Sequence, residues 1–182
     1  MAKLVSATYG DALFSLALEE NKVEDFYDEV TALQQILAQN PEFTALMNHP
    51  KVTKEEKQAV LEKVFAGRAD AELTGFLTLL LKKDRYAELD AIFAHFMSKV
   101  KEHKRIGVGY VRSAMELDAE EKKEIEAKLL ATTSYKTMEM HYAVDPALIG
   151  GLVIRIGDHV VDSSIRTKLD GLKRELNKVS AQ

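Results

Sequence analysis

The 182-residue sequence contains no cysteine, which excludes disulfides, thiolate catalysis and metal binding through sulfur. It also has no long apolar run, since the richest stretch, residues 76–81, is far shorter than the ~20 residues that span a bilayer. The opening Met-Ala-Lys-Leu-Val lacks the apolar core of a signal peptide. We therefore expect a soluble protein that inserts no segment into a membrane directly and associates with one only through partners.

The sequence also has no excess of basic residues. Lysine and arginine number 25 against 29 acidic residues, so the formal net charge at pH 7 is -4. Binding of nucleic acid requires a concentrated basic surface, because the phosphate backbone supplies most of the attraction. We expect no nucleic-acid partner.

Patterns typical of enzymes are also missing. The histidines never take the His-Glu-x-x-His spacing of a metal site, and no Gly-x-x-x-x-Gly-Lys-Ser/Thr nucleotide loop is present. Ser98 and Lys101 match the Ser-x-x-Lys form of some acyl-transfer enzymes, but the supporting motifs are missing and both lie on a polar helix face. The sequence therefore predicts no catalytic residue, no metal, no cofactor and no small-molecule ligand.

The first hundred or so residues carry apolar side chains at helical spacings of three and four. Pro41 and Pro50 interrupt this pattern, Thr53 and Glu56 form a capping box, and Gly67 is expected to end the fourth helix. The six predicted helices lie, in order, in residues 4–19, 23–37, 42–47, 53–67, 70–83 and 89–105. Short loops between six helices indicate a compact antiparallel bundle.

Beyond Arg105 the spacing changes to two. A strand is expected from Ile106, then a helix over 118–130 with Asp118 and Glu121 at its start, and a second strand over 138–144. With the hairpin and final helix described next, the order is β-α-β-β-β-α. We therefore predict a mainly α chain, in which an N-terminal six-helix bundle (residues 1–105) is followed by a small α+β domain (residues 106–182).

The most informative segment is 145–169. Its glycine pair, Gly150 and Gly151, permits positive φ and close backbone approach and begins a strand over 152–156. Gly157 and Asp158 form a turn pair, after which β character resumes. Either Ser163 or Ser164 can then cap a helix whose first apolar residue is Ile165.

This segment, Gly-Gly-Leu-Val-Ile-Arg-Ile-Gly-Asp followed by Val-Asp-Ser-Ser-Ile-Arg-Thr-Lys-Leu, closely resembles the C-terminal signature of the delta subunit family of F-type ATP synthase, which includes the mitochondrial oligomycin-sensitivity-conferring protein. Residues 9–17, Tyr-Gly-Asp-Ala-Leu-Phe-Ser-Leu-Ala, resemble the family's opening helix, where Gly10 stands in place of the usual alanine. The two matches lie near opposite ends, so the resemblance covers the whole chain. The residues that we assign to the structural motif are Gly150, Gly151, Gly157, Asp158, Asp162 and Arg166.

The resemblance implies a non-catalytic connector, or stator subunit, of a proton-translocating F-type ATP synthase. Its expected partners are the alpha subunits of the catalytic head and the b-type subunits of the peripheral stalk. Rotary catalysis applies torque to the head, and a connector of this kind keeps the head from turning. The expected location is the cytoplasmic side of the cell membrane, as a peripheral part of the complex.

Two predicted helices, the first and the fifth, are apolar around most of their circumference. Such a helix is either buried on all sides or covered by a partner, and the residues alone leave these alternatives about equal. The resemblance implies that the groove between them takes the N-terminal amphipathic helix of an alpha subunit. The candidate groove residues are Tyr9, Ala12, Leu13, Leu16, Leu77 and Leu80.

A heptad-like seam marks the last helix, with apolar residues at 165, 169, 172, 176 and 179. We expect Ile165 and Leu169 to pack inward on the sheet. Leu176 and Val179 lie beyond the expected reach of the strands, and the resemblance implies that they meet the C-terminal end of the stalk subunits.

Two other functions remain open on the residues alone. A free-standing helical adaptor that binds peptides would use the same apolar helices, but it would have no reason to carry the C-terminal signature. A hydrolase built around Ser98 would be revealed by an activity assay.

Overall fold

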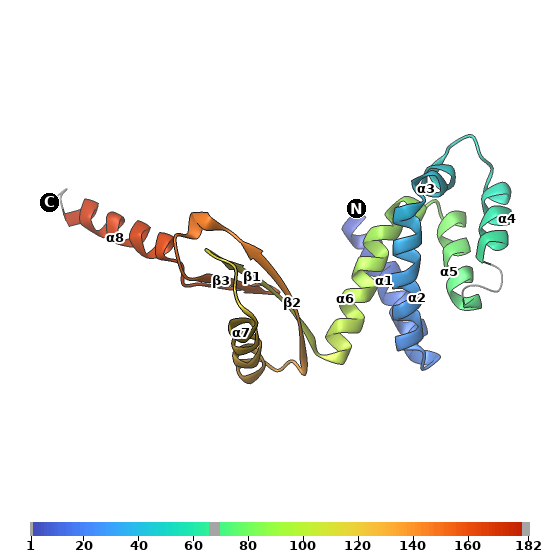
Figure 1. Ribbon diagram of the computed structural model, residues 1–182. Helices are drawn as coiled ribbons and strands as arrows, with labels where there is room; N and C mark the ends of the chain where they lie inside the picture. The colour runs from blue at the N-terminus through green and yellow to red at the C-terminus, as the bar shows by residue number, and fades with distance from the viewer. Residues whose placement is uncertain (1, 66–69, 180–182) are drawn as a thin grey trace. The chain divides into compact units, whose positions relative to one another are not determined.

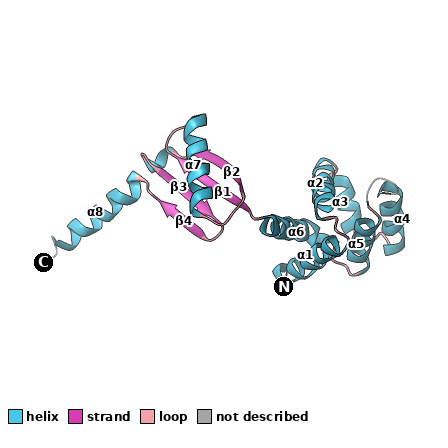
Figure 2. Cartoon of the chain, turned by 90° about the horizontal axis from the view of Figure 1, so that it is seen from below, coloured by secondary structure: helices cyan, strands magenta, loops and turns pink. Residues whose placement is uncertain are grey.

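The computed structural model describes residues 2–65 and 70–179, with side chains described for 4–65 and 70–174. The described chain is mostly helical, with eight α-helices and one small four-stranded mixed sheet. It divides into two compact units, Met1–Val100 and Lys101–Gln182. Figures 1 and 2 show the elements of each unit. The expected end of the fourth helix at Gly67 lies outside the described residues.

The first unit is built from helices around one apolar core. Its elements are α1 (Ala2–Glu19), α2 (Val23–Gln39), α3 (Pro41–Asn48), α4 (Lys54–Phe65), α5 (Ala71–Lys82), the 3-10 turn η1 (Tyr86–Glu88) and α6 (Leu89–Lys104), whose residues 101–104 fall in the second unit. Every one of these elements contributes buried apolar side chains to a single cluster. The helical stripes of the sequence therefore point to a common interior.

The helix ends follow local hydrogen-bonding chemistry. The backbone N–H of Thr53 donates to Glu56 Oε2 (3.0 Å), and the Glu56 N–H donates to Thr53 Oγ1 (3.3 Å), as the capping box predicts. Asp70 caps α5 by accepting from the Glu72 N–H at 3.1 Å, and it also pairs with Lys22 at 3.0 Å. The latter contact ties the start of α2 to the start of α5.

Gly10 has a packing role that the sequence did not indicate. A Cβ at this position would lie 2.7 Å from His95 Cδ2 and 3.1 Å from the Ile92 carbonyl oxygen, both on α6. Glycine therefore allows α1 to approach α6 more closely than alanine would. His95 in turn lies 2.9 Å from Asp11 Oδ1 through its Nε2.

The second unit is an α+β arrangement. Its elements are β1 (Ile106–Ser113), α7 (Ala119–Thr132), β2 (Thr137–Val144), the 3-10 turn η2 (Pro146–Leu148), β3 (Leu152–Ile156), β4 (His159–Asp162) and α8 (Ile165–Val179). The sheet order is β2-β1-β3-β4, with β1 parallel to β2 and the other pairs antiparallel. This element order is the predicted β-α-β-β-β-α.

Helix α7 packs against one face of the sheet (Figure 2). It begins at a capping box of Asp118 and Glu121, and the Tyr142 hydroxyl donates to the Lys122 carbonyl at 3.3 Å. On this face Gly107 and Gly109 leave room for methionines of β2, since a Cβ on either glycine would approach a methionine sulfur to 2.8 Å or less. Because side chains alternate along each strand, one face of the sheet is covered by α7 and the other face points away from it.

The signature segment holds β3, β4 and the start of α8 together. Gly151 has φ +78°, and a Cβ there would lie 2.5 Å from the Ser163 carbonyl oxygen. Gly157, at φ +55°, and Asp158 form the two-residue loop between β3 and β4. Ser164 is the cap, because its Oγ accepts from the Thr167 N–H at 3.2 Å.

Helix α8 differs from expectation. Ile165 and Leu169 were expected to pack inward on the sheet, yet they are 42% and 50% exposed. Helix α8 leaves the sheet at its first turn and contacts η2, and near its start the Ile165 side chain packs against Gly150. Its apolar stripe is open to solvent from its first turn.

Candidate partner-binding surfaces

The first candidate surface lies where α1 and α5 meet. The Tyr9 ring of α1 packs edge-on against the Phe76 ring of α5, with centroids 6.5 Å apart. One and two turns further along α1, Ala12 is exposed and Leu16 is half-buried. Tyr9, Ala12 and Leu16 share one face of the helix because they are three and four residues apart. This face has small and apolar side chains within reach of a partner.

Three of the predicted groove residues lie elsewhere. Leu13 and Leu80 are fully buried, and Leu77 is 2% exposed. All three belong to the core of the first unit, so they have no free surface to offer a partner helix. The correction has a simple cause: a helix that is apolar nearly all round does not reveal from its composition which side faces the core.

Two residues that the sequence analysis missed extend the exposed surface of α5. Gly75 and Leu79 are both exposed, and Leu79 retains 42% of its accessible surface. A Cβ at Gly75 would meet nothing within 4 Å. Helical spacing could have indicated both residues. The buried residues of α5 follow one stripe, and Gly75 and Leu79, which are four residues apart, fall outside it.

The second candidate surface is α8. Leu169 and Leu172 are 50% and 56% exposed. The backbone of α8 is described to Val179, but the side chains of Leu176 and Val179, the predicted stalk contacts, lie outside the described residues. The exposed stripe therefore starts one to two turns earlier than predicted.

Hydrogen bonds at Asp162 fix the direction in which α8 leaves the sheet. Its carboxylate accepts from the Ser164 N–H (2.8 Å) and the Thr167 hydroxyl (2.8 Å). These bonds, the backbone N–H of Ser164 first, lower the pKa of Asp162. Of the other motif residues, Arg166 is exposed on the first turn of α8. The motif thus has a mechanical role in presenting α8.

The described residues contain neither a metal-binding cluster nor a membrane-spanning helix. Across 2–65 and 70–179 there is no cluster of three or more residues that could hold a metal ion. No helix in the same ranges is long and apolar enough to cross a membrane. Ser98 is exposed on α6.

The comparisons with known proteins agree with the resemblance. The family described as ATP synthase delta (OSCP) subunit matches residues 5–176. The chain belongs to this family. An ATP synthase subunit delta of Lachnoclostridium phytofermentans is 51% identical over 179 residues, covering 98% of each chain, and one of Enterococcus hirae is 29% identical over 174 residues, covering 96% of each.

The fold has a relative among solved structures. A chain in the cryo-EM structure of the Toxoplasma gondii mitochondrial ATP synthase hexamer superposes with a TM-score of 0.71 at 24% identity, covering 94% of this chain and 96% of that one. Membership of the delta (OSCP) family makes the chain a non-catalytic stator subunit of an F-type ATP synthase. A free-standing adaptor does not account for a family match that extends through both units.

Proposed function

We propose that the chain connects the catalytic head to the peripheral stalk through two separate surfaces. Residues 1–105 act as a six-helix bundle that binds the N-terminal helix of an alpha subunit at the surface shared by α1 and α5. Residues 106–182 bind the C-terminal end of b-type stalk subunits through α8. The complex holds the chain on the cytoplasmic side of the cell membrane. The family match over both units carries this proposal.

The exposed face of α1 and α5 supports the first contact. Ala12 and Gly75 are small and exposed, which lets the backbone of a partner helix approach closely. Leu16 and Leu79 can supply apolar contact, and burying one leucine-sized side chain contributes ~1.5–3 kcal/mol. Helix-in-groove recognition uses anchors at this helical spacing.

The composition of α8 supports the second contact. Its exposed leucines are accompanied by basic residues, with Asp170 the single acidic residue within 165–174. The basic residues of that range are Arg166, Lys168, Lys173 and Arg174. A partner helix with an apolar seam and acidic flanks fits such a surface, because opposite charges beside a seam favour the correct pairing.

A substitution at Ala12 tests the first contact. Ala12→Trp places a large ring on the exposed face of α1, so it should abolish binding of a synthetic alpha-subunit N-terminal peptide in calorimetry. The fold should persist because Ala12 is exposed. The matched control is Ala32→Trp, which adds the same ring to an exposed position of α2 and should leave binding unchanged.

Two results would contradict the proposal. Intact folding with intact peptide binding in Ala12→Trp would mean that the alpha subunit binds elsewhere. Equal loss of binding in the Ala32→Trp control would contradict it too, because the loss would then not be specific to the exposed face of α1. Circular dichroism on both variants establishes that the fold is retained.

A further inference from the structure

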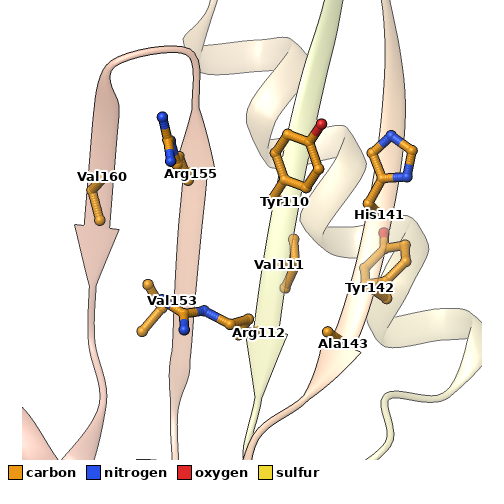
Figure 3. A pocket seen from close by; sticks show the side chains of 9 residues that line it. All are labelled: Tyr110, Val111, Arg112, His141, Tyr142, Ala143, Val153, Arg155 and Val160. Carbon is orange, nitrogen blue, oxygen red and sulfur yellow. The ribbon is translucent and has the colours of Figure 1, made fainter.

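The sheet of the second unit has a second face with a distinct chemistry. Side chains alternate across a strand, so the residues of β1 at even positions point away from α7. Their cross-strand neighbours share that face: Tyr110 pairs with His141 on β2 and with Arg155 on β3, and Arg112 pairs with Val153. Figure 3 shows these side chains in front of the sheet, with a helix behind it.

These side chains line a depression of about 480 Å³. At its rim Tyr110 is 53% exposed and Val160 of β4 is 58% exposed, while Val153 is buried at its floor. The face is thus open and offers apolar surface as well as polar groups. A volume of this size accommodates a few side chains rather than a whole helix.

Part of the depression is a flat, preorganised platform. The rings of Tyr110 and His141 stack with centroids 4.9 Å apart and planes 18° apart (Figure 3). Polar contacts fix the His141 side of the platform. His141 Nε2 lies 3.1 Å from Glu139 Oε1 on the same strand, and Glu139 Oε2 lies 2.6 Å from Lys101 Nζ. The Glu139 carboxylate beside the platform is therefore already paired with a lysine.

Two guanidinium groups complete the site. Arg155 Nε donates to the Gly157 carbonyl at 3.1 Å, which fixes the side chain against the hairpin turn. Within the residues that the structure describes, Arg155 makes no ion pair. Arg112 is already paired, because its Nη1 lies 3.8 Å from Asp145 Oδ2 in an ion pair. Arg112 and Arg155 are diagonal neighbours on adjacent strands, and Figure 3 shows their guanidinium ends pointing apart, that of Arg155 toward the hairpin turn and that of Arg112 toward Val153.

We propose that this face binds an acidic peptide segment of a partner protein. A carboxylate of the segment bonds to Arg155, since a guanidinium fork matches a carboxylate in geometry and charge. One apolar side chain of the segment rests on the platform of Tyr110 and His141, and another contacts Val160. This contact is additional to the two surfaces proposed above and does not depend on either of them.

The test uses the full chain, labelled with ¹⁵N, and two blocked tetrapeptides. Ac-Glu-Phe-Glu-Leu-NH₂ should shift the amide signals of Tyr110 and Arg155. The matched Ac-Gln-Phe-Gln-Leu-NH₂ should bind about fivefold or more weakly, as expected for the loss of one charge-assisted contact. Arg155→Gln should weaken binding of the acidic peptide similarly, and Arg155→Lys, which keeps the charge but not the fork, should weaken it less.

Lys123→Gln is the matched control, because it removes an exposed cation from α7 on the other side of the sheet. The proposal is overturned if the two peptides bind equally, or if Lys123→Gln weakens binding as much as Arg155→Gln does. It is also overturned if citrate displaces the peptide at equal concentration, which indicates a site for free anions. Binding to phosphatidylglycerol vesicles without binding to the acidic peptide would overturn it in favour of a lipid surface.

Discussion

Replacing Gly151 by valine should destabilise the second unit specifically. At φ +78° a β-branched residue is strained, which costs about 1–3 kcal/mol by itself. The added Cβ would also lie 2.5 Å from the Ser163 carbonyl oxygen and 3.1 Å from Ser164 Cα. Both neighbours are backbone atoms at the junction of β4 and α8, so they cannot rotate away. The total cost should therefore exceed the conformational cost alone.

Gly157 supplies the control that separates these two contributions. It too has a positive φ, +55°, but a Cβ there would meet nothing within 4 Å. Gly157→Ala should therefore cost only the left-handed conformation, about 1–2 kcal/mol. Gly151→Ala should cost more than Gly157→Ala because of the contact with Ser163, and Gly151→Val should cost the most.

Amide hydrogen exchange on the intact chain measures these costs for each unit separately. Every ~1.4 kcal/mol lost should accelerate exchange of the most protected amides in β1 and β3 about tenfold. Amides of the first unit serve as the internal control and should not change. If Gly151→Val and Gly157→Ala accelerate exchange equally, the close approach of Gly151 to Ser163 does not constrain the fold, and our account of the motif is refuted.

Three further predictions follow from the structure. Residues 1–105 expressed alone should be helical by circular dichroism and melt cooperatively, since the first unit has its own core; a disordered fragment would contradict this. Leu169→Glu with Leu172→Glu should leave the melting temperature unchanged, because both side chains are exposed, but abolish capture by a b-type stalk C-terminal peptide; unchanged capture would exclude this stripe. The hydrogen bond from Lys101 lowers the pKa of Glu139 below its ordinary 4.5, so this pair stabilises the unit above pH 4.5 and the contribution is lost as pH falls through the lowered value. In Lys101→Met the Glu139 pKa should rise in a ¹³C NMR titration and the acid-dependent loss of stability should shrink, and an unchanged titration would contradict the pairing.

The sequence predicted element order and caps well because these depend on neighbours along the chain. A capping box such as that of Asp118 and Glu121 involves two residues three positions apart, and both hydrogen bonds form as expected. The turn at Gly157 likewise follows from its own dihedral preference and the next residue. Hydrogen bonds and turns between near neighbours can therefore be recognised from the sequence.

The orientation of apolar helices could not be predicted in the same way. Leu13 and Ala12 are adjacent and both apolar, yet one is fully buried and the other exposed. The choice depends on contacts with distant helices, which periodicity cannot resolve when most positions are apolar. The exposed depression at Tyr110 was missed for a related reason, because its residues come from four strands that only the sheet register brings together.

The close approach at Gly10 has a consequence for exchanging parts between members of the family. A relative with alanine at this position carries an α1 whose methyl group would meet the His95 side chain and the Ile92 carbonyl of this chain. The two helices are therefore matched to each other as a pair. A chimaera that imports α1 from such a relative must import α6 with it, or the transplanted helix will sit further from its neighbour.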